Sequence, residues 1–222
     1  MNKRTWLLSA TIVAAGLLGG AALYGPQLLA GYRFMNALDR HYSSYEANGG
    51  AWPQPQDSCA LCHGVRGQPA NAQYPALAGQ PVSYLQAQLR AFAQGKRHSP
   101  QMQPLAASLS EERILALAEY FARQVPHVTD APAANDALRA RGQASVAARG
   151  CTACHAPDLS GSPVGPRIAG QGQRYLLDQL NAFKQGLRTD PSGAMNATAS
   201  LLSEDELAAL AHYIAGLATT AR

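Results

Sequence analysis

Charged side chains and cysteines are both scarce in this sequence of 222 residues. Charged residues make up 14% and hydrophobic residues 47% of it, whereas about 25% charged residues is usual for soluble proteins. This composition excludes an intrinsically disordered chain, which needs high charge and little apolar content. The four cysteines are too few for a disulfide-dense scaffold in a chain of this length.

Basic clusters and repeated apolar runs are also missing. The formal net charge is only +4, and Lys and Arg are spread along the chain without forming a cluster or a basic stripe interleaved with aromatics. We therefore expect no nucleic-acid partner. A single long apolar run excludes a membrane protein with several spans.

That single run lies at the N-terminus, where a basic start (Lys3-Arg4) precedes the uncharged residues 6–24. This layout is typical of a bacterial export signal. As a helix, these residues would span roughly 28 Å, close to the bilayer core of about 30 Å. The sequence thus favours a retained membrane anchor within residues 1–30, with a signal peptide cleaved near Gly20-Ala21-Ala22 as the alternative. In both cases the rest of the chain lies on the periplasmic side of the inner membrane.

The remainder of the chain is an internal duplication. Cys59-Ala60-Leu61-Cys62-His63 recurs 92 residues later, as Cys151-Thr152-Ala153-Cys154-His155. Ala78-Gly79-Gln80 recurs 91 residues later, at residues 169–171. Since a period this long marks whole domains rather than solenoid units, we expect two tandem domains. The predicted segments are a stalk or linker at 31–57, a first domain at 58–126, a linker at 127–134 and a second domain at 135–222.

Helical patterns fill both copies. The sequence predicts helices at about 82–94 and 173–185, each followed by a loop carrying a methionine. A closing helix then begins at Ser110 or Ser203, because a serine cap with acids in the first turn suits a helix N-terminus. A leading helix at about 135–149 has no regular counterpart in the first copy, where Pro53 and Pro55 interrupt the chain; residues 27–46 either replace it or form a stalk. No alternating strand pattern occurs, so the fold class is all-α.

Every cysteine belongs to one of two C-x-x-C-H motifs, the attachment signature of c-type haem. Two thiols three residues apart on one helical turn can each form a thioether to a haem vinyl group, and the adjacent histidine then faces the iron. A zinc site would need further ligands nearby, a thioredoxin-like dithiol a βαβ pattern, and two disulfides would not need the histidines. We therefore predict two covalently bound haem c groups, attached to Cys59, Cys62, Cys151 and Cys154.

The second axial ligand of each iron is predicted to be a methionine. Met102 lies 39 residues after His63, and Met195 lies 40 residues after His155. Equivalent methionines in otherwise polar loops favour His/Met ligation, which raises the reduction potential and leaves no open coordination site. His98 could compete for iron, although a solvent-exposed loop histidine is favoured.

Other polar residues receive weaker predictions. Lys96-Arg97 and Arg188 either neutralise haem propionates or are solvated charges at helix ends, and the sequence does not decide between these. No role is predicted for His41, His127 or His212, the last of which occupies an exposed-looking helix position.

These motifs together resemble the two-domain dihaem class I cytochromes c of the cytochrome c-four type. The resemblance extends to residues 75–80 and 165–171 and to Tyr84–Arg97 with its second copy. It implies two cytochrome c folds packed face to face, with the propionate edges of the haems close across the interface. It also implies that the carbonyls of Pro75 and Pro166 accept hydrogen bonds from the proximal imidazoles.

The resemblance further implies an electron carrier of a respiratory chain that transforms no substrate itself. Electrons would come from a quinol-oxidising complex, such as a cytochrome bc-type complex, or from a dehydrogenase. They would leave to a terminal oxidase of the haem–copper type or to a reductase. The alternative is the cytochrome subunit of a periplasmic dehydrogenase or of another dihaem oxidoreductase complex. A retained N-terminal anchor would make the protein a tethered carrier or a subunit of a membrane complex.

Overall fold

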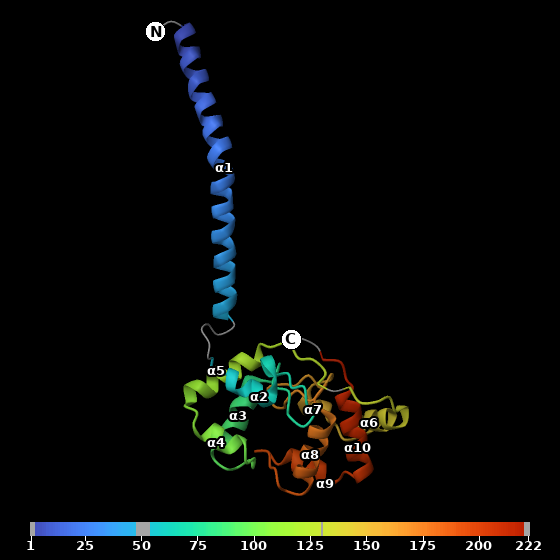
Figure 1. Ribbon diagram of the computed structural model, residues 1–222. Coiled ribbons are helices and arrows are strands. Elements are labelled where there is room, and N and C mark those ends of the chain that lie inside the picture. Colours follow the sequence, from blue (N-terminus) through green and yellow to red (C-terminus); the bar gives the residue numbers. More distant parts are fainter. Residues whose placement is uncertain (1–2, 48–53, 130, 220–222) are drawn as a thin grey trace. The chain divides into compact units, whose positions relative to one another are not determined.

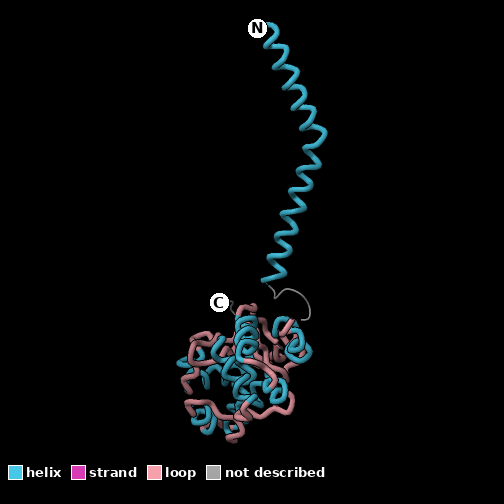
Figure 2. Tube along the Cα trace, turned by 90° about the vertical axis from the view of Figure 1, so that its left-hand side faces the viewer, coloured by secondary structure: helices cyan, strands magenta, loops and turns pink. Residues whose placement is uncertain are grey.

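The computed structural model describes residues 3–47, 54–129 and 131–219 of the chain. It divides into two units, Met1–Gln54 and Pro55–Arg222, which are described separately. The described residues form α-helices, two short 3₁₀ helices and connecting loops, and contain no strand (Figure 2). The all-α prediction is therefore confirmed.

The first unit is one helix, α1 (Lys3–Ala47), with Pro26 inside it. Between residues 18 and 35 of this helix, apolar side chains such as Leu23, Leu28 and Phe34 are exposed. In the part of the chain that the structure describes, no helix is both long and apolar enough to cross a membrane. This finding does not support the predicted retained anchor within residues 1–30, of which residues 1–13 and 17 lie outside the described side chains.

The second unit contains both copies of the repeat (Figure 1), and in each copy a motif turn, a middle helix, a short methionine helix and a closing helix follow one another. The first copy consists of η1 (Asp57–Cys59), α2 (Ala60–His63), η2 (Val65–Gly67), α3 (Val82–Ala93), α4 (Met102–Ala107) and α5 (Glu111–Ala122). The second copy consists of α6 (Asp136–Ala148), α7 (Thr152–His155), α8 (Gln173–Lys184), α9 (Ala194–Ser200) and α10 (Glu204–Ala215).

The predicted long helices lie where the sequence placed them, but the two methionine segments were wrongly predicted as loops. Met102 opens the helix α4, and Met195 lies in the first turn of α9. Neither helix has a side-chain cap. At six and seven residues they are too short to show a helical period in the sequence.

Side-chain caps begin the closing helices. The hydroxyl of Ser110 accepts a hydrogen bond from the N–H of Arg113, and Ser203 forms a complete capping box with Glu206. In the same way, the side chain of Asn135 accepts from the N–H of Leu138 and starts α6. Each cap satisfies a backbone donor that the first turn of a helix leaves free.

Each copy has its own apolar core, in which the closing helix packs against the middle helix. In the first copy the buried cluster is Leu85, Leu117, Ala118 and Phe121. In the second copy the buried cluster also draws on α6 and is larger: Val146, Leu159, Ala169, Leu176, Leu202, Leu207, Leu210, Ala211, Ile214 and Ala215. Residues 54–58 of the first copy contain no α-helix equivalent to α6.

The leading helix α6 crosses α10 at a glycine. A Cβ atom added to Gly142 would lie 2.3 Å from the carbonyl oxygen of Ala209 and 2.5 Å from the Cβ of Tyr213. The missing side chain therefore lets the two backbones approach closely.

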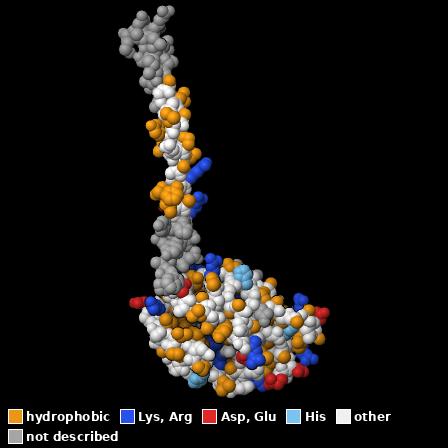
Figure 3. Space-filling model, viewed as in Figure 1, with side chains coloured by type: hydrophobic (Ala, Val, Ile, Leu, Met, Phe, Trp, Pro, Cys, Tyr) orange, Lys and Arg blue, Asp and Glu red, His pale blue; other side chains and the backbone are white. Residues whose placement is uncertain are grey.

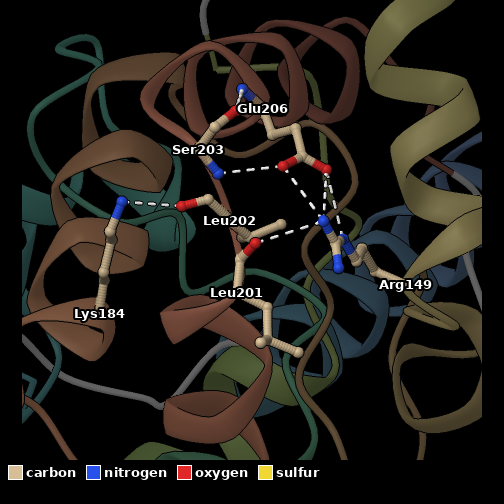
Figure 4. A network of polar contacts seen from close by, with 6 residues as sticks. All are labelled: Arg149, Lys184, Leu201, Leu202, Ser203 and Glu206. Atoms are coloured by element: carbon tan, nitrogen blue, oxygen red, sulfur yellow. Dashed lines mark hydrogen bonds and ion pairs between the residues drawn. The ribbon is translucent and has the colours of Figure 1, made fainter.

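An ion pair and a cap fix the end of α6 to the start of α10 (Figure 4). Arg149 donates to Glu206 Oε1 at 2.9 Å and to Oε2 at 3.2 Å, while Glu206 also accepts from the N–H of Ser203 at 3.0 Å. Beside them, Lys184 Nζ donates to the carbonyl of Leu202 at 2.7 Å. One carboxylate thus caps a helix and binds its neighbour.

Gly142→Ala is expected to destabilise the second domain by about 1–3 kcal/mol, because the added methyl group overlaps the backbone of α10. At an ordinary helix position the same change stabilises by about 1 kcal/mol. Urea unfolding of the holoprotein measures the effect. A variant at least as stable as the parent would contradict the close crossing.

Glu206→Gln is expected to lower the urea midpoint at neutral pH. The backbone N–H of Ser203, and then Arg149, hold the pKa of Glu206 below its usual 4.5. A depressed carboxyl pKa contributes stability above the unfolded-state pKa, and that contribution disappears as the pH falls through the folded-state pKa. The difference between parent and variant should therefore vanish in acid. Glu112→Gln, at an exposed position of α5, is the control, and an equal loss in both variants would count against the cap.

Candidate haem sites

Each C-x-x-C-H motif forms a single helical turn, as predicted. Cys59 precedes α2, and Cys62 and His63 complete it; Cys151 and α7 repeat this arrangement. Both histidines are buried, at 7% and 6% exposure. The first cysteine of each pair is half-buried and the second is exposed, so each short turn carries two free thiols next to a buried imidazole.

The chain leaves the turn through a residue with positive φ. This residue is Gly64 (φ +71°) in the first copy, where a Cβ atom would lie 1.8 Å from the carbonyl oxygen of Gln68. In the second copy, Ala156 adopts the same φ of 71°. With ψ at 161°, a non-glycine residue costs about 1–3 kcal/mol in this region of backbone conformation, so the surroundings of α7 hold the turn in place against that cost.

The alternative interpretations of the cysteines find no support. The four cysteines form no disulfide. Burial raises the pKa of the Cys59 and Cys151 thiols, whereas a reactive dithiol has one thiol with a lowered pKa. Within the described part of the chain, no group of three or more His, Cys, Asp or Glu side chains could hold a metal ion.

One hydrogen bond orients each imidazole. Nδ1 of His63 lies 2.9 Å from the carbonyl oxygen of Pro75, and Nδ1 of His155 lies 2.8 Å from that of Pro166. A carbonyl can only accept, so Nδ1 carries the proton and Nε2 keeps its lone pair for a metal. Burial lowers the pKa of both histidines, which keeps the rings neutral. The contacts implied by the resemblance are confirmed.

Hydrogen bonds to the preceding loops fix the start of both methionine helices, α4 and α9, which pack against the middle helices α3 and α8. Met102 and Met195 are half-buried, and the N–H of Met102 donates to Ser99 Oγ at 3.2 Å. The N–H of Met195 donates to Asp190 Oδ1 at 2.9 Å, and bonds from Ser192, Met195 and Asn196 lower the pKa of that carboxyl despite its desolvation. The nearby His98 is exposed, as the sequence favoured.

The two copies exchange glutamine side chains across their interface. Gln80 donates to the carbonyl of Arg167 at 2.8 Å and accepts from its N–H at 3.1 Å. Reciprocally, Gln171 donates to the carbonyl of Ala76 at 2.7 Å and accepts from its N–H at 2.8 Å. Reciprocal contacts of this kind relate the two copies by a pseudo-two-fold axis.

A second reciprocal layer is built from arginines. Arg97 donates to Tyr175 at 3.0 Å and to Gln179 at 3.0 Å in the other copy. The equivalent Arg188 donates to Tyr84 at 3.1 Å and to Gln88 at 3.1 Å. Each guanidinium also lies over a phenylalanine of its own copy, Phe92 at 4.6 Å and Phe183 at 4.5 Å. This layer joins α3 and α8 through positive charges.

The structure bears on the question that the sequence left open for Lys96, Arg97 and Arg188. Arg188 is only 8% exposed and Arg97 is half-buried, so these residues are not solvated charges at helix ends; only Lys96 is exposed. Arg97 is also close enough to His63 to help lower the pKa of that imidazole.

One prediction about a histidine was wrong. His212, predicted to be exposed, is 7% exposed and belongs to the buried part of α10. Alanines surround His212 in the sequence of α10, so the sequence pattern did not distinguish the buried side of this helix from its exposed side.

The interface carries positive charge without protein counter-charge. Among the described residues, no carboxylate pairs with Arg97, Arg188 or the buried Arg167, and Nη2 of Arg167 has no hydrogen-bond partner. Arg167 was not predicted as a site residue, because nothing in its local sequence indicates burial. Each haem brings two anionic propionates, so these cations, together with the motifs and the oriented imidazoles, fit haem at both sites.

Sequence comparison identifies the family. The family model described as "Cytochrome c" matches this chain twice, over residues 54–123 and 139–218. The chain belongs to the cytochrome c family. The "Thiosulfate dehydrogenase electron acceptor" of Thiomonas intermedia (strain K12) is 37% identical over 183 residues, covering 76% of this chain and 82% of that protein. "Cytochrome c4" of Thiocapsa roseopersicina is 35% identical over 167 residues, covering 72% and 86%.

A solved structure agrees with both relatives. The crystal structure of reduced recombinant cytochrome c4 from Pseudomonas stutzeri superposes with a TM-score of 0.67 and is 30% identical, covering 78% of this chain and 97% of that chain. The protein is therefore a cytochrome c with two tandem domains and two covalently bound haem c groups. It is an electron carrier, as predicted, and not itself an enzyme.

Gln171→Ala is expected to destabilise the holoprotein by about 1–3 kcal/mol, because it leaves the buried N–H and carbonyl of Ala76 without partners. Urea unfolding followed by haem absorbance measures the loss. Gln185→Ala, at an exposed helix end, is the control. If both variants unfold at the same urea concentration, the exchanged glutamine does not hold the interface.

Proposed function

We propose that this cytochrome accepts electrons from a dehydrogenase on the periplasmic side of the inner membrane and passes them to a membrane respiratory complex. The observation that carries the proposal is the reciprocal interface, which joins two equivalent haem sites in one unit. Two one-electron sites held together suit a donor that releases electrons in pairs.

We assign the haem-holding residues by the repeat. Covalent attachment is assigned to Cys59, Cys62, Cys151 and Cys154, and axial ligation to His63, Met102, His155 and Met195. When bound, haem supplies a one-electron Fe(III)/Fe(II) couple. Two protein ligands on each iron leave no position for a substrate, which suits electron transfer rather than catalysis.

The protein side chains contribute orientation and charge. The carbonyls of Pro75 and Pro166 fix the proton on Nδ1 of each proximal histidine, and this contact sets ligand orientation and basicity. Arg97 and Arg188 supply cations for propionates at the interface. Because these groups are already held by hydrogen bonds, little has to move when an electron arrives.

The N-terminal run and the segment boundaries belong to the same proposal. Covalent haem attachment and function outside the cytoplasm require export, which residues 1–30 would direct. The segments 31–57, 58–126, 127–134 and 135–222 remain our proposed division. The linker is anchored to the second domain, since the N–H of Thr129 donates to the carbonyl of Gly170 at 3.0 Å.

No nucleic-acid partner is proposed. On the face that Figure 3 shows, Lys and Arg side chains are interspersed with Asp and Glu over the cytochrome unit. A mixed surface of this kind lacks the basic stripe that phosphate backbones require.

The relative named as a thiosulfate dehydrogenase electron acceptor favours a dehydrogenase donor over a quinol-oxidising complex. The test mixes the oxidised holoprotein with a thiosulfate dehydrogenase and thiosulfate, or with a cytochrome bc-type complex and quinol, and follows haem reduction by stopped flow. We expect faster reduction in the first mixture. Fast reduction by the bc-type complex alone would contradict the proposed donor.

The same relative supports a second candidate, the cytochrome subunit of a dehydrogenase complex. Size-exclusion chromatography of the mixture separates the two possibilities. Co-elution at micromolar concentration indicates a subunit, whereas separate elution with rapid reduction indicates a carrier that docks transiently. Electrons delivered to a haem–copper oxidase by the reduced protein would support the carrier.

Met102→His and Met195→His are expected to lower the reduction potential of one haem each, by a sizeable fraction of the ~0.8 V that axial ligands span. A thioether stabilises ferrous iron better than a second imidazole does. Potentiometric titration measures each midpoint, and loss of the Met–iron charge-transfer band reports the ligand. Met35→Leu, outside both copies, is the control; an unchanged titration of either histidine variant would refute that ligand assignment.

A further inference from the structure

Arg167 lies between equivalent carbonyls of the two domains. Its side chain is among the most deeply buried in the protein, at 2% exposure. Nε donates to the carbonyl of Ala78 in the first domain at 3.1 Å, and Nη1 donates to the carbonyl of Ala169 in the second. Ala78 and Ala169 correspond in the repeat, so the guanidinium lies close to the pseudo-two-fold axis.

Only one copy supplies this charge. The corresponding residue of the first copy is Ala76, whose backbone is bound by Gln171 in the same way as that of Arg167 is bound by Gln80. The two positions therefore differ in the side chain and not in how the backbone is held. Two arginines could not occupy one site near the axis. A single guanidinium there contacts equivalent carbonyls of both domains.

Arg167 and the residue that accepts its Nε–H lie a few residues along the chain from the two carbonyls that orient the proximal histidines. Arg167 directly follows Pro166, whose carbonyl orients His155. Ala78, which accepts its Nε–H, lies three residues after Pro75, whose carbonyl orients His63. The two proximal ligands are thus connected to the same charge through short backbone segments.

This charge persists in the buried site. No carboxylate of the described residues pairs with it, and Nη2 has no hydrogen-bond partner. Burial lowers the pKa of Arg167 to about 10, which leaves the guanidinium protonated at neutral pH. A fixed cation in a medium of low dielectric acts on charge changes nearby far more strongly than a solvated one.

We propose that Arg167 serves both haem sites as a fixed positive charge and raises their two reduction potentials by similar amounts. Reduction adds one negative charge to each iron, and a cation near the axis favours that state at both irons. The inference rests on the proposed electron-transfer function, but it concerns the midpoints alone.

The test is potentiometric titration of full-length holoproteins without any partner. Arg167→Gln removes the charge, and we expect the reduction equilibrium constant of both haems to fall by roughly tenfold, which is 59 mV for one electron. Arg167→Lys keeps the charge and should leave the reduction equilibrium constant of each haem within about twofold of the parent's value. Arg174→Gln, at an exposed surface position, should change neither.

Three results would overturn the proposal. These are unchanged midpoints in Arg167→Gln, a shift confined to one haem, or an equal fall in Arg167→Lys, which would mean that packing and not charge is responsible. Haem content and urea midpoint of each variant are measured alongside, and Arg167→Met, which keeps a long unbranched side chain without the charge, replaces Arg167→Gln if that variant does not fold. Failure here leaves the dehydrogenase assay unaffected, whereas slow reduction by the dehydrogenase with shifted midpoints would count against the proposed function alone.

Discussion

The exchange of glutamine side chains between the domains is the interaction on which the rest of the unit depends. Gln80 and Gln171 each satisfy both backbone groups of a buried residue in the other domain. A buried amide group without a partner costs more free energy than one hydrogen bond contributes to stability. Separating the buried parts of the two domains is therefore unfavourable. The segments held in this way follow Pro75 and Pro166, so the contact that joins the domains also places the carbonyls that orient the proximal histidines.

Charge at this interface complements the cofactor rather than the protein. No described carboxylate forms an ion pair with Arg97, Arg188 or Arg167. Burying positive charges without a counter-charge is unfavourable in the polypeptide alone. Anionic propionates would relieve it. Folding and cofactor binding are therefore linked through the same few side chains, and the proposal for Arg167 extends this link to the reduction potentials.

Local features were predictable from the sequence, and long-range ones were not. The cysteine motifs, the repeat and the serine caps at Ser110 and Ser203 depend on neighbouring residues, so the helices and the haem attachment turns could be placed. The burial of Arg167 and Arg188 depends on partners 87 to 104 residues away, and His212 lies on α10, which packs against α6 and α8. No local period in the sequence marks these contacts. The short helices that carry Met102 and Met195 failed for a different reason, because neither has a side-chain cap nor two full turns of apolar pattern.

The intact mass of the purified, denatured protein tests most directly whether each copy of the repeat holds a haem. Thioether bonds survive denaturation, so we expect the polypeptide mass plus two haems in a single species. The same spectrum gives the N-terminal residue, and thereby shows whether the export segment is retained or cleaved. A mass corresponding to one haem or none, after expression with the haem-attachment machinery, would contradict the two-site structure.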